Sequence, residues 1–460
     1  MPDLLFSIKN LIDATNGICC NTITMAQTVN GIETDSRKDC SQALFVALRG
    51  YVFDGHQFLQ KAIDSGATLL CVDREFYTST PHCKLPLLIV DDTTAAYQDI
   101  ARFHRRRLDI KVVAITGSSG KTSAKDILTS VLAEAYGDDC VYSTLENTNN
   151  HIGVPLNLLN LRSFHKVAII EMGSNHRGEI EVLSRTAEPD IAIVTSIGSS
   201  HLEFFETLEN VADEKASVFK YLSKSGTAVI PEFSDYKNIL SAAAGSAQKI
   251  YFGKDIRGEY LGGNLQGSSF NLSFGDGDTS RVDWSIHGQY QMDNALAVVA
   301  AAVVLGLNHS TIIAGLSNSK LSGMRMRINT VDDIHWINDA YNANPDSMIA
   351  GLNWLYEFAE PSQLVLVLGD MLELGESSPE NHLDVIRTAY RLFPETRIFT
   401  VGKAMADTVA KLDEAMIGNI IAFADSQSAS VVINSSLQAR DVVFLKGSRG
   451  IKLEVIEPVN

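Results

Sequence analysis

The clearest candidate for an active site in this 460-residue sequence is a glycine-rich segment. It lies between an apolar run at 112–116 and an amphipathic run. The segment reads Gly117-Ser118-Ser119-Gly120-Lys121-Thr122. A strand, a glycine loop and a helix in this order predict a phosphate-binding loop. Backbone N–H groups would close on phosphate oxygens, Lys121 would neutralise the β- and γ-phosphates, and the Thr122 hydroxyl would hold Mg²⁺. The strict pattern has another glycine where this chain has Ile115, so the loop is a variant.

Two further residues are candidate metal ligands beside this loop. Glu171 ends the apolar run 167–171, and His201 follows the apolar run 191–195 by a short loop. Ligands of open α/β sheets bind at the carboxyl ends of the strands. A carboxylate and an imidazole at that edge could hold Mg²⁺. Taken singly, however, each residue type at such a position is more often structural.

Lys215 occupies an unusual position on its predicted helix. It shares a stripe at the spacing i, i+4, i+7, i+8 and i+11 with apolar residues, namely Val211, Val218, Phe219 and Leu222. One interpretation is a lysine whose stem packs while its amine reaches water. The other is a desolvated amine with a lowered pKa that is able to do chemistry. The stripe alone leaves both interpretations open.

The elements that would position these residues fall into three segments, at 1–109, 110–318 and 319–460. The first mixes short strands with short helices, and its strands include 44–48 and 87–90. The second alternates apolar strands and amphipathic helices, which predicts a parallel α/β sheet. A polar, glycine-rich stretch at 258–278 predicts hairpins or loops inserted late in this segment.

The third segment restarts the alternation with three buried strands, at 364–368, 398–401 and 442–445. This pattern predicts a second, smaller doubly wound sheet of the Rossmann type. The sequence therefore indicates an α/β protein with three domains, which suits its length.

Composition excludes several classes of function. The net charge of -17 argues against a nucleic-acid or anionic-membrane partner. No stretch approaches the roughly 18 apolar residues that a membrane-spanning helix needs, and the first 20 residues lack a signal-peptide pattern. The six cysteines show no CxxC spacing, which is typical of reduced thiols. We therefore expect a cytoplasmic enzyme without membrane insertion.

Longer motifs surround the candidate residues and extend over nearly the whole chain. They lie at Thr116–Thr122, Asn149–Pro155, Glu171–Glu179, Asp339–Ser347, Gly369–Glu376 and Lys446–Arg449. Together they resemble the Mur ligases, and most of all the members that add D-alanyl-D-alanine. The Asp-Asn-Pro-Arg motif typical of the members that add the third residue is not found here. Ile115 is expected in this family's variant of the phosphate loop.

The resemblance implies an ADP-forming ligase of peptidoglycan precursor synthesis. Its substrates would be UDP-N-acetylmuramoyl-tripeptide and D-alanyl-D-alanine, its cofactors ATP and two Mg²⁺ ions, and it would act as a monomer through an acyl phosphate. Residues 1–109 would form the UDP-substrate domain and 110–318 the central ATP-binding domain. Residues 319–460 would form a Rossmann-like domain that contacts the dipeptide and the nucleotide.

The resemblance also implies roles for single residues. Thr122 would bind one Mg²⁺, while Glu171, His201 and a carbamylated Lys215 would bind the second. The implied nucleotide contacts are Gly117 to Thr122, Asn294, Arg325 and Asp339. The implied substrate contacts are Asp35, Ser36, Arg37, Asp54, His56, Asn149, Asn150, Asn342, Asn344 and Asp346. The family often carries Gly-x-His-Asn-x-x-Asn where this chain reads Gly288-Gln-Tyr-Gln-Met-Asp-Asn294, so adenine contacts before Asn294 are not assigned.

Two alternatives remain on the sequence alone. A related ligase, such as a folylpolyglutamate synthetase, would share the loop but accept a different amine. A P-loop ATPase acting as a switch would hydrolyse ATP without forming a covalent product.

Overall fold

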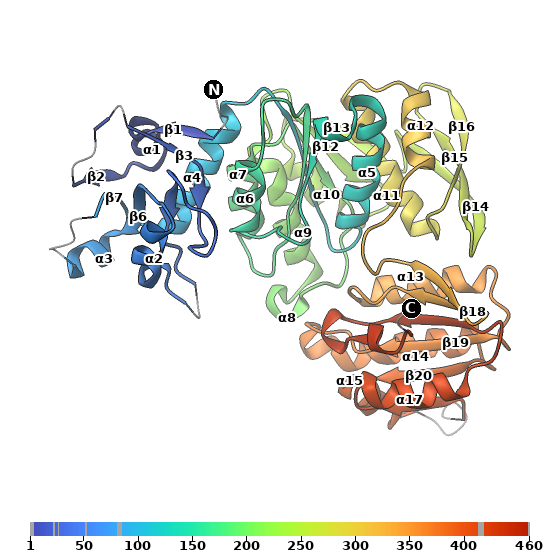
Figure 1. The fold of residues 1–460 in the computed structure, drawn as a ribbon. Coiled ribbons are helices and arrows are strands. Elements are labelled where there is room, and N and C mark those ends of the chain that lie inside the picture. Colours follow the sequence, from blue (N-terminus) through green and yellow to red (C-terminus); the bar gives the residue numbers. More distant parts are fainter. Residues whose placement is uncertain are drawn as a thin grey trace.

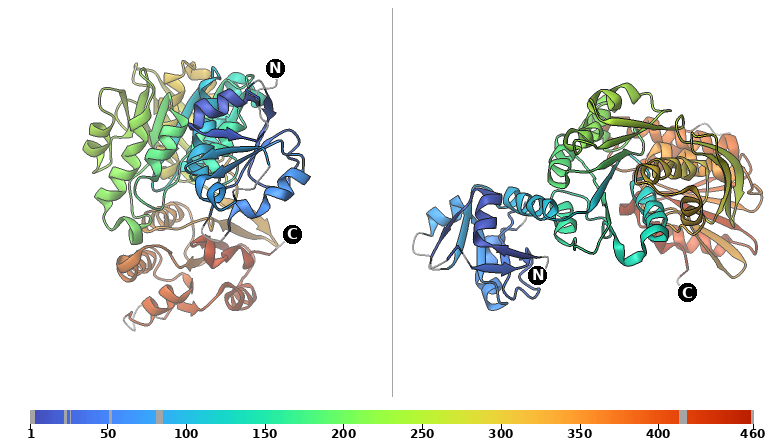
Figure 2. Two further views of the ribbon diagram at one scale, coloured as in Figure 1. Left: turned by 90° about the vertical axis from the view of Figure 1, so that its left-hand side faces the viewer. Right: turned by 90° about the horizontal axis from the view of Figure 1, so that it is seen from above.

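The computed structural model describes residues 4–21, 24–25, 27–50, 53–80, 85–412 and 418–458. Figure 1 shows three α/β domains, with the central domain in contact with both of the others. The N-terminal and C-terminal domains lie apart from each other in Figure 1 and in the right view of Figure 2. Within the described residues, no helix is long and apolar enough to cross a membrane. The described cysteines are free thiols, and Cys83 lies outside the described residues.

The N-terminal domain is built on a five-stranded sheet of order β2-β7-β6-β5-β4 and a separate β1–β3 pair. Its strands are β1 (Leu5–Ser7), β2 (Ile18–Cys20), β3 (Thr28–Asn30), β4 (Ile32–Glu33), β5 (Leu44–Val46), β6 (Leu69–Asp73) and β7 (Leu87–Val90). Its helices are α1 (Ile8–Thr15), η1 (Gly55–Phe58), α2 (Leu59–Asp64), α3 (Arg74–Ser79) and α4 (Thr93–Arg106). The predicted strand at 44–48 ends early, because Leu48 turns to accept a bond from Gly55 N instead.

Helix α4 joins the first two domains. It packs against α1 of the N-terminal domain and against α6 and α7 of the central domain. Its buried residues, among them Ile100 and Ala101, belong to one apolar cluster that continues into the central sheet. The two domains therefore share a core along this helix.

The central sheet has the order β13-β12-β11-β8-β10-β9, and all its pairings are parallel. Its strands are β8 (Lys111–Thr116), β9 (Val141–Ser143), β10 (Val167–Glu171), β11 (Ile191–Val194), β12 (Thr227–Pro231) and β13 (Gln248–Phe252). Alternate residues of β8 join two different apolar clusters, one on each face. A parallel sheet covered on both faces explains the nearly continuous apolar strands of the sequence.

The helices of the central domain cover both faces of this sheet (Figure 1). They are α5 (Lys121–Tyr136), η2 (Asp138–Cys140), α6 (Gly153–Leu159), α7 (Glu179–Ala187), α8 (Leu202–Phe205), α9 (Leu208–Ala216), η3 (Ser217–Tyr221), α10 (Lys237–Ala243), α11 (Gln289–Val304) and α12 (His309–Ser317). The glycine-rich stretch forms an antiparallel sheet of β14 (Arg257–Asn264), β15 (Gly267–Ser273) and β16 (Thr279–Trp284). The hairpin prediction for this stretch is confirmed.

The C-terminal sheet has the order β17-β18-β22-β19-β20-β21. Its strands are β17 (Arg327–Val331), β18 (Ile334–Asn338), β19 (Leu364–Gly369), β20 (Arg397–Val401), β21 (Ile420–Phe423) and β22 (Val442–Lys446). Its helices are α13 (Pro345–Tyr356), η4 (Gly375–Ser377), α14 (Ser378–Leu392), α15 (Lys403–Val409), α17 (Ser426–Ser436), η5 (Arg449–Ile451) and η6 (Leu453–Val455). The prediction of a smaller sheet is wrong, since both sheets have six described strands. The antiparallel hairpin β17–β18 supplies the extra edge strand.

Candidate active site

The glycine loop lies where β8 ends and α5 begins, at the carboxyl edge of the central sheet. Gly117 and Gly120 have φ angles of 148° and 83°, a region that side chains rarely adopt. A Cβ atom would lie 2.1 Å from Thr195 Oγ1 at the first position and 2.2 Å from Asn294 Oδ1 at the second. Both positions therefore require glycine, and Asn294, which is predicted to contact the nucleotide, lies against the loop.

The segment that follows β11 holds this loop in place. Ser118 N donates to Ser196 O at 2.9 Å, and Ser119 N donates to Ser196 Oγ at 3.0 Å. Ser118 Oγ both donates to Gly198 O and accepts from Gly198 N. The phosphate loop and residues 195–198 therefore form one unit.

Lys121 folds over the loop from the first turn of α5. Its Nζ donates to Gly117 O at 2.6 Å. Burial lowers the pKa of this amine, the nearby Glu171 carboxylate opposes that shift, and the charge of Arg325 adds to it. The charges of Arg325 and Glu171 therefore both act on the predicted phosphate-binding lysine.

Glu171 receives hydrogen bonds on both carboxylate oxygens. Thr122 Oγ1 donates to Oε2 at 2.8 Å, and Asn149 Nδ2 donates to Oε1 at 2.8 Å. The side chain is buried at the end of β10, with 2% of the residue exposed. The topology thus joins three predicted site residues from different elements.

Lys215 lies inside the protein near the same edge. Only 1% of the residue is exposed, and Nζ donates to Ser174 Oγ at 2.8 Å. Burial lowers the pKa of the amine to about 7, the charge of Lys121 adds to the shift, and the Glu214 and Glu179 carboxylates oppose it. The alternative in which the amine reaches water is wrong.

Two neighbours of Lys215 were not assigned roles from the sequence. Ser174 belongs to the motif 171–179, but nothing in the spacing of that motif pointed to its bond with the lysine. Glu214 is buried and accepts hydrogen bonds from Gly178 N and Ile180 N. It therefore holds the start of α7 in place and does not lie on a solvent-exposed helix face. Only contacts between distant elements reveal both roles.

His201 contacts the C-terminal domain. Its Nδ1 lies 2.5 Å from Glu373 Oε2. Burial lowers the pKa of the imidazole, the Glu373 carboxylate opposes the shift, and the charges of Lys121 and Lys215 add to it. The charges of both lysines therefore act on His201. Glu373 was not singled out, although it lies in the motif 369–376.

The start of α13 also contacts the central domain. Asn344 Nδ2 donates to Ser119 Oγ at 2.9 Å, and Asp346 Oδ2 accepts from Ser199 N at 3.1 Å. These two predicted dipeptide contacts therefore touch the phosphate-loop unit here. Asn342, the third predicted contact of this motif, takes part through its backbone O, which lies 3.5 Å from Lys446 Nζ.

Two of the remaining predicted nucleotide contacts, Arg325 and Asp339, lie around the linker between the central and C-terminal domains, and the third, Asn294, lies on α11. The guanidinium of Arg325 lies 3.7 Å from the centre of the Tyr341 ring. Asp339 accepts from Lys446 Nζ and from Met326 N. Asn294 Nδ2 donates to Gln291 Oε1 at 2.9 Å, which orients the side chain beside Gly120.

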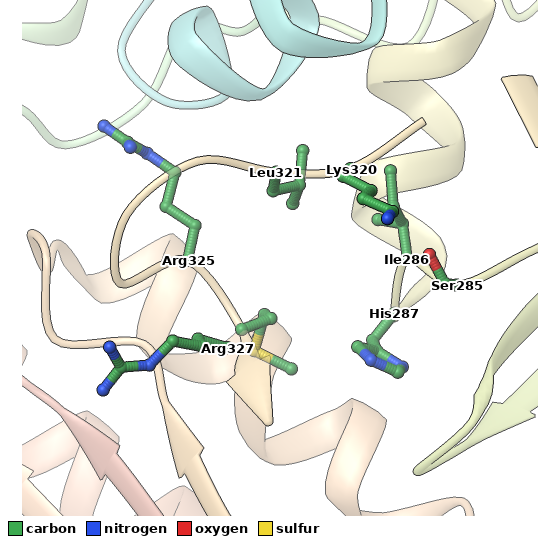
Figure 3. Close-up of a pocket in the computed structure, with 8 residues that line it drawn as sticks. Ser285, Ile286, His287, Lys320, Leu321, Arg325 and Arg327 are labelled. Carbon is green, nitrogen blue, oxygen red and sulfur yellow. The ribbon is translucent and has the colours of Figure 1, made fainter. Parts of the chain in front are cut away.

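A cavity of about 110 Å³ lies at this linker (Figure 3). Its lining residues are Ser285, Ile286, His287, Lys320, Leu321, Arg325, Met326 and Arg327. Figure 3 shows the guanidinium of Arg325 directed away from His287. Burial lowers the pKa of His287 to about 4, so this imidazole is neutral at pH 7.

The predicted substrate residues of the N-terminal domain do not join this group. Arg37 is exposed and pairs with Asp35 at 2.7 Å, which holds the pKa of that carboxyl below its usual range. Ser36 is buried, and its O accepts from Ser65 Oγ. Asp54 begins η1 by accepting from His56 N, and it also lies 2.6 Å from His56 Nδ1.

Asn149 and Asn150, which follow β9, behave differently from each other. Asn149 reaches Glu171, as described above. Asn150 Oδ1 accepts from Ile152 N at 3.1 Å and from Gly153 N at 2.9 Å, so it starts the turn that leads into α6. Only the first of these two predicted substrate contacts points into the site.

Comparison with known proteins identifies relatives of all three domains. The family models that match are "Mur ligase family, catalytic domain" at residues 28–105, "Mur ligase middle domain" at 115–302, and "Mur ligase, glutamate ligase domain" at 324–449. The UDP-N-acetylmuramoyl-tripeptide–D-alanyl-D-alanine ligase of Bacillus subtilis is 31% identical, with 98% of this chain and 97% of that protein covered.

Solved structures match over similar lengths. A crystal structure of MurF from Acinetobacter baumannii gives a TM-score of 0.88 at 30% identity, covering 99% of this chain and 98% of that one. A MurF ligase from Thermotoga maritima in complex with ADP gives a TM-score of 0.80 at 25% identity, covering 92% and 95%.

Proposed function

This chain belongs to the Mur ligase family, and we propose on that basis that it joins D-alanyl-D-alanine to UDP-N-acetylmuramoyl-tripeptide at the expense of ATP. The observation that carries the proposal is the match, over nearly the whole chain, to relatives that bear this activity in their names. The gathering of Lys121, Glu171 and Lys215 at one sheet edge supports it from the structure.

The reaction needs an activated acid, because a carboxylate oxygen is a poor leaving group. Transfer of the γ-phosphoryl group of ATP to the tripeptide carboxylate gives an acyl phosphate and ADP. The amine of the dipeptide then attacks the carbonyl carbon, loses a proton, and expels phosphate as the amide forms. Lys121 would neutralise charge on the transferring phosphoryl group, and the N–H groups at the start of α5 would hold phosphate oxygens.

The residues around Glu171 fit Mg²⁺. The Thr122 hydroxyl would hold one Mg²⁺, and the buried Glu171 carboxylate and the His201 imidazole would hold a second, since this hard cation accepts such donors. Bound there, Mg²⁺ would neutralise phosphate oxygens and polarise the carboxylate. Glu171 is already held by Thr122 and Asn149, so its orientation is fixed.

We further propose that Lys215 carries a carbamate. A neutral amine can add CO₂, whereas an ammonium cannot. The lowered pKa of about 7 and the complete burial of this residue favour the neutral amine. The product would present two oxygens and a negative charge toward the charge of Lys121. Ser174 Oγ, which now accepts from the amine, would be able to donate to a carbamate oxygen.

The division of labour among domains is also a proposal. Residues 1–109 would bind the UDP part through Asp35 to Arg37 and the Asp54–His56 turn. Residues 110–318 would bind ATP, and residues 319–460 would bind the dipeptide near Asn342, Asn344 and Asp346. Each residue named for the reaction comes from one chain, so a monomer would suffice.

The test is a reaction with ATP, UDP-N-acetylmuramoyl-tripeptide and D-alanyl-D-alanine, followed by mass spectrometry and by ADP and phosphate assays. We expect one ADP and one phosphate per amide bond, and turnover only when both the tripeptide and the dipeptide are present. ADP release at a comparable rate without the dipeptide would instead indicate an ATPase. Ligation of a different amine would indicate a related ligase.

A further inference from the structure

His201 lies at the end of a segment that is hydrogen-bonded both to the phosphate loop of the central domain and to the C-terminal domain. Residues 196–198 bond to the phosphate loop through Ser118 and Ser119. Ser199 N donates to Asp346 of the C-terminal domain, and a Cβ atom on Gly198 would lie 2.2 Å from that carboxylate. Residues 196–201, which we call the bridging segment, thus connect the ATP-binding loop to the C-terminal domain.

Glu373 completes this contact. Its Oε2 lies 2.5 Å from His201 Nδ1, and its backbone O accepts from Glu203 N at 3.3 Å. A Cβ atom on Gly375 would lie 3.1 Å from Glu203 Cα, so the two chains pack closely. Figure 1 shows α8, which begins directly after His201, at the face of the central domain turned toward the C-terminal domain.

Both partners of this contact have an unusual backbone. His201 has a φ of 52° and Glu373 a φ of 63°, the left-handed region that residues other than glycine seldom adopt. Such conformations persist where the surroundings hold them, and they concentrate at functional sites. The approach of the two side chains therefore depends on two strained turns, one in each domain.

The chemistry of the pair suits a metal ligand. An imidazole that binds a cation through one nitrogen is commonly held at the other by a carboxylate, which fixes the ring and raises its basicity. Here a carboxylate oxygen lies within ion-pair distance of Nδ1, although the pair does not have hydrogen-bond geometry. Nε2 is then the nitrogen available to a cation. Glu373 differs from Glu171 in that it comes from the C-terminal domain and is partly exposed, with 46% of its side chain accessible.

We propose that Glu373 is a positioning residue that holds His201 for Mg²⁺, so that docking of the C-terminal domain completes the metal site. The inference deepens the proposed function and rests on it for the identity of the metal. Binding of ATP at the loop would then favour docking of the C-terminal domain, and docking would favour ATP binding, because both contact the bridging segment. A ligand that favours one state over another shifts the population by its differential affinity.

The experiment compares Glu373→Gln with Glu376→Gln, an exposed glutamate three residues later. Mn²⁺ serves as the probe, and electron paramagnetic resonance counts the ion bound in the presence of a non-hydrolysable ATP analogue. We expect Glu373→Gln to weaken binding of the second ion about tenfold, the lower end for partners of metal ligands. The Mg²⁺ concentration for half-maximal ligation should rise similarly, while kcat at saturating Mg²⁺ falls less. Glu376→Gln should change neither value.

A double-mutant cycle tests whether the effect passes through His201. In a His201→Ala background, Glu373→Gln should weaken Mn²⁺ binding less than about twofold, because residues acting through one contact are not additive. Glu373→Asp should show an intermediate loss. Thermal unfolding should be unchanged in Glu373→Gln, since the side chain is partly exposed.

Three results would overturn the inference. These are unchanged Mn²⁺ binding in Glu373→Gln, tighter binding, which would make the contact a competitor of the metal, and full additivity with His201→Ala. The Mn²⁺ measurement does not depend on turnover. A wild-type protein that binds two ions but forms no amide would therefore count against the proposed function and leave the positioning role standing.

Discussion

The phosphate-loop edge of the central domain and the motif residues of the N-terminal domain differ in where their side chains point. At the loop, Thr122, Asn149 and Glu171 come from three elements and meet within hydrogen-bonding distance. In the N-terminal domain, Asp35 pairs with Arg37 two residues away, and Asp54 pairs with His56 two residues away. The first group is assembled by topology. In the second, the Asp35–Arg37 pair is formed by a local turn, whereas His56 also accepts from Asp73 N at the end of β6.

This difference has a physical origin. The carboxyl ends of parallel strands lie at one edge, so polar residues that follow such strands converge whatever their separation in sequence. Short turns capped by aspartate satisfy their own backbone, and they need no partner from elsewhere. Convergence therefore identifies residues that act on a reaction, whereas local pairs can equally shape a binding surface or merely end a turn.

The largest effect should come from Lys121→Ala. The amine lies over the loop and would neutralise the phosphoryl group in transfer. We expect turnover to fall at least about 100-fold, on the order of 3 kcal/mol in the barrier, with the fold retained. Steady-state kinetics and circular dichroism check both parts.

Lys111→Ala is the matched control, because that exposed lysine starts β8, the strand that leads into the loop. Among the described residues its ion-pair partner is Asp190, at 3.4 Å. Its turnover should stay within about twofold of wild type, as an exposed ion pair contributes little. Near-normal turnover in folded Lys121→Ala would show that the loop is not part of the active site. The contrast between the two regions would then fail.

A somewhat smaller loss should follow Lys215→Ala, and a carboxylate should partly reverse it. The variant would lack the carbamate, so turnover should fall at least about tenfold, or about 1.4 kcal/mol. Acetate or another short acid could occupy the space left by the side chain and supply the missing charge. Lys220→Ala, one turn further along and exposed, should neither lose activity nor respond to acetate.

The lowered pKa of Lys215 also predicts how reactivation by CO₂ depends on pH. Because the folded-state pKa is lowered to about 7, the amine is half neutral near pH 7 and almost wholly neutral by about pH 8. Reactivation of CO₂-depleted wild-type enzyme at constant dissolved CO₂ should therefore rise through pH 7 and level off above about pH 8. A rate that keeps rising toward the ordinary lysine pKa of about 10.4 would show that Lys215 is not desolvated.

The sequence predicted the loop, its flanking elements and the most apolar strands of each sheet, because apolar periodicity and glycine spacing are local signals. It also placed Lys215 on a buried stripe. Glu373, Ser174 and Glu214 could not be found in this way, since their roles depend on contacts between segments far apart in the chain. The extra edge strand β17 was missed for a related reason, because its pairing with β18 carries no parallel α/β pattern.

The smallest effect on turnover, and the prediction that sharpens the comparison most, is that of Arg37→Ala. The guanidinium is exposed and donates hydrogen bonds to the Asp35 carboxylate. If the N-terminal domain binds the UDP part, these donors would turn to the phosphates. A hydrogen bond to a charged group contributes about 1.5–3 kcal/mol, so KM for the UDP substrate should rise about tenfold. KM for ATP and kcat should stay unchanged, because the transferring phosphoryl group lies in another domain.

Lys38→Ala provides the matched control, since this neighbouring cation is also exposed. Neither variant should measurably change the free energy of unfolding, because the exposed Arg37–Asp35 pair is screened by water. Steady-state kinetics with each substrate varied in turn separates the outcomes. A fall in kcat at saturating substrate would place Arg37 in the reaction rather than in binding. An unchanged KM would show that the Asp35–Arg37 pair only stabilises its own turn. The UDP group would then have to be bound elsewhere in the domain.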